Sequence, residues 1–158
     1  MKKYRIEGKW VIIFFAATLL WMLAERLSGL HDQNIEYHYI VSNFFSVVAI
    51  ALYVFALLDK RKNYFGGKMT WLQGFVSGLV ISLGVAILTP LGQYITSALI
   101  TPHFFENMIA YTVENEKMTQ TAAEAYFNMK SYIIQSTIFA PLAGVLTSAL
   151  VALFIRKK

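Results

Sequence analysis

Hydrophobic residues along the chain are gathered into four long blocks, and polar segments separate one block from the next. The blocks cover about residues 10–27, 40–58, 71–90 and 132–155. Each block is close to the roughly 20 residues that a helix needs to cross the hydrocarbon layer of a membrane. Because a backbone in lipid must satisfy its own hydrogen bonds, and no alternating strand pattern is present, helices are expected. The pattern predicts an all-α integral membrane protein with four transmembrane helices in a single domain over residues 1–158.

The first block resembles the hydrophobic region of a secretory signal, because Lys2, Lys3, Arg5 and Lys9 precede it. A secretory signal ends in a cleavage site of small residues. Here the block is followed by "ERLSGL", which has no such site. The first helix is therefore expected to be a retained anchor.

The third block is followed by "TPLGQYITSALITP", where a helix that begins at Trp71 has already crossed a layer about 30 Å thick. Apolar residues keep the helical period in this stretch, and polar or small residues fill the other face. The helix either bends at Pro90 and continues outward with one side in water, or forms a re-entrant or interfacial turn, or lines a polar cavity inside the bundle. The first arrangement is preferred. The polar face consists of Thr89, Gly92, Gln93, Thr96 and Ser97.

Residues 102–130 are expected to form a helical cap on the outer side, between the third and fourth transmembrane helices. Apolar residues follow one side of a first short helix, and a capping-box pattern at Thr121 and Glu124 indicates a second one. A turn is expected near residues 116–120. The pattern leaves open whether the two helices stand as a hairpin or lie on the membrane surface.

Charge is distributed unequally over the segments that connect the blocks. Eleven of the 14 cations lie in residues 1–9, 59–70 and 156–158, whereas residues 25–39 and 100–131 are acidic. Basic segments stay in the cytoplasm, so both termini are expected there. The net charge of +5 is thus a sign of topology, and the basic rim should attract anionic lipid headgroups rather than nucleic acid. The eleven cations are Lys2, Lys3, Arg5, Lys9, Lys60, Arg61, Lys62, Lys68, Arg156, Lys157 and Lys158.

Composition and motifs narrow the chemistry that is expected of the chain. Hydrophobic residues make up 57% of it and charged residues only 15%, which argues against a soluble core. Without cysteine, disulfides and thiolate chemistry are excluded. No nucleophile elbow, phosphate-binding loop, zinc-protease motif or pair of intramembrane carboxylates is present. The chain is therefore expected to be neither an enzyme nor a cofactor protein.

Small residues recur at every fourth position in the third and fourth hydrophobic blocks. Such spacing lets two helix backbones approach closely where lipid gives no hydrophobic drive to association. We therefore expect these two helices to pack against each other. The residues concerned are Gly74, Gly78 and Ser82 in one helix and Ala140, Gly144 and Ser148 in the other.

All three histidines fall in the segments predicted to face outward. His31 and His38 belong to "HDQNIEYH", and His103 begins "HFFE". Imidazoles together with carboxylates suit zinc, copper or nickel. The preferred interpretation is a polar loop with titratable residues and no metal, and His31, His38 and His103 are the candidates if a metal binds.

Polar residues also occur at similar depths in several of the predicted helices. Asn43, Gln93 and Gln135 would form a polar pocket in the outer half of the bundle if their helix faces converge, and Glu25 ends the first block near the same depth. Ionisable groups at that depth usually turn to an interior partner or snorkel. If Glu25 turns inward, Gln93 or Lys130 is its candidate partner. Interhelical hydrogen bonds explain the uncharged residues without any ligand, and this is the preferred interpretation.

The order of several segments resembles a known family. "MTWLQGFVSGLVIS" opens the third block, "ITPHFFENM" follows it, and "FNMKSY" leads into the fourth. In these features the chain resembles a family of small bacterial membrane proteins named domain of unknown function forty-one ninety-nine. The resemblance covers nearly the whole chain. It implies a four-helix protein of the bacterial inner membrane, and it supplies no catalytic residue.

Two functions are left open by the sequence. A non-enzymatic accessory or scaffold module, forming a homo-oligomer or binding another membrane protein, is preferred because small-residue faces are present and central charges are absent. The alternative is a small-solute transporter or channel component that uses the polar pocket, although coupled carriers normally have ionisable residues near the membrane midplane.

Overall fold

The computed structural model describes residues 2–157, and every regular element in that range is a helix. This confirms the all-α prediction. The one β-type contact among these residues is an isolated bridge between Met69 and Lys157. The α-helices are α1 (Arg5–Leu27), α2 (His38–Asn43), α3 (Phe45–Asn63), α4 (Trp71–Ile95), α5 (Phe104–Glu114), α6 (Gln120–Tyr126) and α7 (Met129–Ile155).

Four helical segments are long and apolar enough to cross a membrane, as predicted. They are Arg5–Leu27, Ile35–Asn63, Trp71–Ile100 and Met129–Ile155. The second segment combines a short 3-10 turn (Ile35–Tyr37), α2 and α3. It extends past the predicted end at Leu58 because Asp59 and Lys60 find charged partners on α1 and continue the helix.

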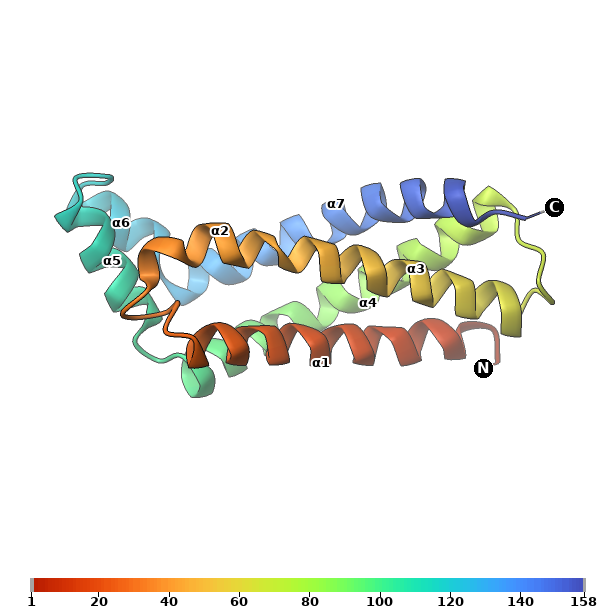
Figure 1. Cartoon of the computed structure of the whole chain (residues 1–158), viewed down its shortest axis with the longest axis horizontal. Coiled ribbons are helices and arrows are strands. Elements are labelled where there is room, and N and C mark those ends of the chain that lie inside the picture. Colours follow the sequence, from red (N-terminus) through yellow and green to blue (C-terminus); the bar gives the residue numbers. More distant parts are fainter. Residues whose placement is uncertain (1, 158) are drawn as a thin grey trace.

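The four long segments run alongside one another and divide the molecule into two ends (Figure 1). The N-terminus, the C-terminus and the turn between α3 and α4 lie at one end, which we call the termini end. The helices α5 and α6 lie at the opposite end, which we call the α5–α6 end. The chain therefore runs along the bundle four times, and both termini lie at the same end.

The helices α4 and α7 pack closely along a line of small residues, which we call the α4–α7 seam. A methyl group added to Gly78 would overlap Ser148, and one added to Gly144 would overlap both Ser82 and the hydroxyl of Tyr53. The structure thus places five of the six small residues face to face: Gly74, Gly78 and Ser82 lie against α7, and Gly144 and Ser148 lie against α4. The sixth, Ala140, lines a cavity instead.

The hydrophobic core lies in the half of the bundle next to the termini end. Leu57, Ile81 and Ala152 are almost completely buried there, and Met69 closes the core from the turn before α4. Large apolar side chains on the outer faces of the helices are exposed, as lipid contact requires. The buried apolar core therefore lies nearer the termini end than the cavity that Ala140 lines.

The structure of the third span differs from the predicted one, in which one side of the helix lies in water. The helix α4 passes through Pro90 to Ile95 and continues as a π-helical turn (Thr96–Ile100). Thr96 is buried, and it lines a cavity together with Thr89 and Gln93. Thus the helix does continue, but its polar face turns towards α1 and α7, because Gly92 lets the aromatic ring of Phe15 approach.

The segment between α4 and α7 contains the short helices α5 and α6, with a different cap from the expected one. Thr119, not Thr121, is the N-cap of α6, and its side chain accepts a hydrogen bond from the backbone N–H of Ala122. Glu124 accepts from the side chain of Gln120 instead of completing a capping box. Thr119 takes this role because its backbone is extended, as an N-cap requires.

Candidate functional site

A buried carboxylate, Glu25, lies at the α5–α6 end and is contacted by four side chains. Its Oε1 accepts hydrogen bonds from Trp21 Nε1 at 2.6 Å and from Ser42 Oγ at 2.7 Å. Its Oε2 lies 3.1 Å from His31 Nε2 and 3.8 Å from His38 Nδ1. One oxygen of Glu25 is thus well bonded, whereas the other faces two imidazoles at longer distances. We call Glu25, His31 and His38 the Glu–His–His cluster.

A sharp turn after α1 brings His31 back over Glu25. The chain reverses at Gly29, whose φ of 76° is unfavourable for residues with a side chain. The backbone N–H of Leu30 then bonds the carbonyl of Glu25 at 3.0 Å. His38 and Ser42 follow one helical turn apart in α2, so both face the same side and reach Glu25.

The helix α5 covers the Glu–His–His cluster. The ring of Phe104 lies 5.0 Å from the ring of His31 and 4.8 Å from that of His38, centre to centre. Asn107 donates a hydrogen bond of 2.8 Å to the carbonyl of His31. As a result Glu25 and His31 are only 2% and 1% exposed.

Hydrogen bonding in the cluster is incomplete. His31 Nδ1 is buried and has no hydrogen-bond partner within residues 2–157. The nearby Arg26 pairs with Asp32, and the backbone N–H of Gln33 together with Arg26 lowers the pKa of Asp32. Arg26 therefore neutralises Asp32 and not the buried Glu25.

The structure brings two of the three candidate histidines together and separates the third. His31 and His38 share Glu25, with one nitrogen or oxygen of each residue within 4.8 Å of the other two. His103 lies outside this cluster, where its side chain is 72% exposed and contacts Glu106. The sequence could not show that Glu25 joins the histidines, because the link depends on the turn at Gly29.

The structure does not gather the polar-pocket candidates at one place. Asn43 is exposed, and its side chain bonds the carbonyl of Tyr39 on its own helix. Gln135 bonds Ser131 and lies beside Lys130, whereas Gln93 bonds Ser97. The expected partners of Glu25, Gln93 and Lys130, are replaced by the histidines. Local hydrogen bonds along each helix satisfy these side chains and remove the need to converge.

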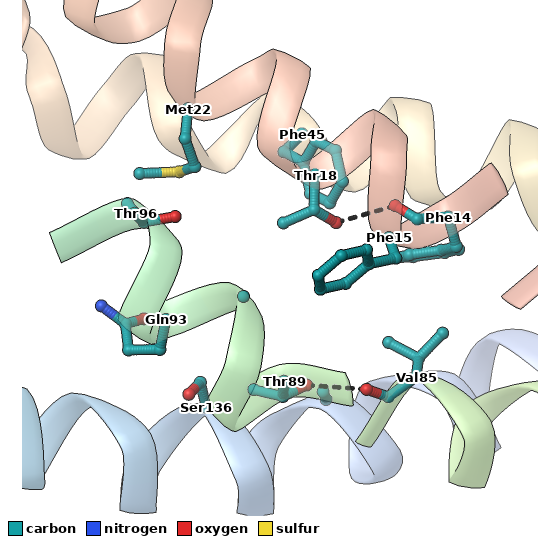
Figure 2. A pocket seen from close by; sticks show the side chains of 12 residues that line it. Phe14, Phe15, Thr18, Met22, Phe45, Val85, Thr89, Gln93, Thr96 and Ser136 are labelled. Carbon is teal, nitrogen blue, oxygen red and sulfur yellow. Dashed lines mark hydrogen bonds between the residues drawn. The ribbon is translucent and has the colours of Figure 1, made fainter. Parts of the chain in front are cut away.

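A cavity of about 210 Å³ lies between α1, α3, α4 and α7, and Gln93 is the one polar-pocket candidate that lines it (Figure 2). Thr18 and Thr89 donate their hydroxyls to the carbonyls of Phe14 and Val85 in their own helices. Ser136 likewise bonds the carbonyl of Tyr132. The hydroxyls of Thr18, Thr89 and Ser136 are thus already satisfied, and much of the remaining lining is apolar.

A second buried ionic cluster lies at the termini end, and the sequence analysis did not predict it. Lys60 Nζ lies 2.9 Å from Glu7 Oε1, and Ser77 Oγ donates to the same oxygen at 2.7 Å. Lys60 also donates to the carbonyl of Lys3 and lies 3.8 Å from the centre of the Tyr64 ring. The feature of the sequence that could have indicated this cluster is Glu7, the one acidic residue in the basic segment 1–9.

These features define the class of the protein: a bundle of four membrane-length helices with a buried ionic cluster near each end. The chain belongs to the family described as "Protein of unknown function (DUF4199)", whose model matches residues 9–157. This confirms the resemblance seen in the sequence. No curated protein and no solved structure matches the chain.

Proposed function

We propose that the chain is a non-enzymatic module of the bacterial inner membrane, acting as an accessory subunit or a scaffold. The observation that carries this proposal is the α4–α7 seam, where the backbones of two helices approach closely between the cavity and the termini end. A transporter needs a path that reaches both sides of the membrane. The close packing at the seam favours a module over a transporter.

The packing around Ser82 is the tightest part of this barrier. Ser82 Oγ shares a hydrogen bond of 2.7 Å with the hydroxyl of Tyr53 and donates to the carbonyl of Gly78. Ser148 is fully buried opposite Gly78. These polar atoms bond one another, which supports a structural role and leaves no group free for a solute.

The Glu–His–His cluster also fits a binding role better than catalysis. Phe104 covers both imidazoles and Glu25 is 2% exposed, so the carboxylate is screened from solvent. A catalytic acid or base must come within hydrogen-bond reach of its substrate. This supports a module without enzymatic activity.

The proposed orientation places the termini end in the cytoplasm. Cations of this end include Arg5, Lys62 and Lys68, which are exposed, and basic segments are retained on the cytoplasmic side. Their proposed partners are anionic lipid headgroups, at roughly 1 kcal/mol for each cation near the surface. The helices α5 and α6 then form a cap on the outer side of the membrane.

The outer face of α7 supports contact with lipid or with a second membrane protein. Its exposed apolar side chains run along the length of the helix. In the membrane such a face is covered by acyl chains, by a second copy of the chain or by another protein. The side chains are Ile134, Ile138, Phe139, Leu142, Leu146, Leu150, Leu153 and Phe154.

Single-cysteine labelling tests the proposal, because the chain has no cysteine of its own. A membrane-impermeant thiol reagent is applied to sealed spheroplasts or to inverted vesicles. Gln93→Cys at the cavity is expected to react from the outer side only. Ser82→Cys and Tyr53→Cys at the seam are expected to react from neither side.

Two exposed positions report the sidedness of the membrane in the same experiment. Lys62→Cys is expected to react only from the cytoplasmic side and Glu116→Cys only from the outer side. Reversal of these two results overturns the orientation. Labelling of Ser82→Cys or Gln93→Cys from both sides overturns the module and establishes a path across the bundle.

The alternative function is a small-solute transporter or channel component. The cavity in Figure 2 is the observation that favours it, because Gln93 and Thr96 line a space of about 210 Å³, and cavities of about 150 Å³ already take a molecule the size of benzene. This alternative requires that Ser82→Cys or Gln93→Cys is labelled from both sides of the membrane.

A further inference from the structure

We propose that the Glu–His–His cluster is a binding site for one zinc ion, held by Glu25, His31 and His38. This inference does not depend on the proposed scaffold role or on the orientation in the membrane. It starts from the types of ligand atom present. Two imidazole nitrogens and one carboxylate oxygen form a ligand set that zinc takes in proteins, with a fourth position left for a water or hydroxyl oxygen.

The distances within the cluster suit a small tetrahedral ion. Zinc–nitrogen and zinc–oxygen bonds of about 2.0–2.2 Å place neighbouring ligand atoms about 3.3 Å apart. Glu25 Oε2 lies 3.1 Å from His31 Nε2 and 3.8 Å from His38 Nδ1. One ligand atom from each of the three residues lies within 4.8 Å of the others. Small side-chain rotations therefore suffice to bring all three atoms into coordination.

The charge balance of the cluster also calls for a cation. Glu25 is buried, and a buried carboxylate is costly without a positive partner. Arg26 is engaged by Asp32. The imidazoles of His31 and His38 are the groups that face the second carboxylate oxygen, and zinc binds imidazole in its neutral form. A divalent ion supplies the positive charge in place of a protonated histidine; with zinc on His31 Nε2, the one proton of that ring stays on Nδ1, which has no acceptor within residues 2–157.

The surroundings of the cluster resemble the supporting shell of a metal site. Trp21 and Ser42 fix Oε1 of the carboxylate, which leaves Oε2 directed at the histidines. Ser42 Oγ lies 3.3 Å from His38 Nδ1 and is close enough to be the fourth ligand or to bond a water in that position. Such supporting contacts orient metal ligands and raise affinity.

The ligands come from three different stretches of chain, so zinc would join them. Glu25 lies in the last turn of α1, His31 lies in the turn that follows, and His38 begins α2. Phe104 and Asn107 of α5 pack on the histidines from the other side. Bound zinc is therefore expected to rigidify the contact between the ends of α1 and α2 and the helix α5.

Metal content and binding of the full chain test the site. The protein is purified in detergent with a tag that lacks histidine, stripped with a chelator, and titrated with Co²⁺, whose absorption spectrum reports tetrahedral coordination, and then with Zn²⁺ in competition. One ion per chain is expected. His38→Gln and His31→Asn are expected to lower the affinity about 100-fold or more, and Ser42→Ala about 10-fold.

His103→Gln is the matched control, because His103 lies in the same half of the protein but outside the cluster. It is expected to bind zinc as the parent chain does. Equal binding by His38→Gln and by His103→Gln overturns the proposal, as does the absence of stoichiometric binding by the parent chain. Circular dichroism and gel filtration establish that the variants fold.

Direct spectroscopy covers the case in which a cluster variant fails to fold. The zinc absorption-edge fine structure of the parent chain is expected to show two imidazoles and a carboxylate at about 2.0–2.2 Å. A spectrum with oxygen ligands alone would show adventitious zinc and would contradict the site.

Discussion

Tyr53 of α3 and Ser82 of α4 share a hydrogen bond of 2.7 Å, and both lie where Gly144 of α7 has no side chain. Three helices meet at this point, and the missing Cβ is what allows them to do so. The first two predictions follow from this contact and from the seam that continues it.

Gly144→Ala is expected to destabilise the bundle, because the added methyl group overlaps Ser82 and the Tyr53 hydroxyl. Overpacking of this kind costs about 1–3 kcal/mol. Unfolding in mixed micelles with increasing sodium dodecyl sulfate measures the loss. Gly8→Ala is the control: it lies on the exposed face of α1 with nothing within 4 Å of the added group, and it is expected to stabilise slightly. Equal stability of the two variants would contradict the packing.

A disulfide is expected to form between Gly74→Cys and Ala152→Cys. A Cβ on Gly74 would lie 3.0 Å from the Cβ of Ala152, close to the separation of about 3.5–4.5 Å found in disulfides. Mild oxidation followed by proteolysis between α4 and α7 measures the cross-link. The pair Gly74→Cys and Gly144→Cys, displaced by eight residues or about 12 Å along α7, should remain reduced. The reverse result would refute the antiparallel register of the α4–α7 seam.

Lys60→Met is expected to destabilise the protein strongly. The substitution leaves Glu7 buried without its cation, and loss of one partner from a buried ion pair costs about 3–5 kcal/mol. Lys62→Met removes the same charge from an exposed position of the same helix and should have little effect. Adding Glu7→Gln to Lys60→Met should recover part of the loss. If the two lysine variants unfold alike, the buried pair carries no stability.

Thr119→Ala is expected to weaken α6, because it removes the hydrogen bond to the backbone N–H of Ala122. Loss of an N-cap costs about 1 kcal/mol. Hydrogen exchange at the amides of α6 measures the change. Thr121→Ala lies two residues away inside the helix and should leave the exchange nearly unchanged. Faster exchange in Thr121→Ala than in Thr119→Ala would contradict this cap and support the capping box at Thr121 that the sequence pattern indicated.

The sequence predicted the number of long helices and their all-α nature because these depend on blocks of apolar residues. Helix ends were less predictable. Asp59 and Lys60 read as a polar loop, yet their partners Lys9 and Glu7 keep them in α3. The sequence alone does not show whether a charged residue has an ion-pair partner when that partner is distant in the chain.

The candidate site was only partly visible in the sequence for a related reason. His31 and His38 were recognisable as ligand types, but their meeting with Glu25 depends on the reversal at Gly29 and on the cover by Phe104. His103 belonged to the same polar pattern, and it lies elsewhere because α5 begins at Phe104 and turns it outward to Glu106.

The α4–α7 seam imposes an order on biosynthesis. The glycine face of α4 emerges from the ribosome before its partner α7, because α5 and α6 are made between them. The helices α1 and α3 can associate while translation continues. The small-residue face of α4 has no partner until α7, with Ser148, has been synthesised. Closure of the seam is thus timed by the synthesis of α7.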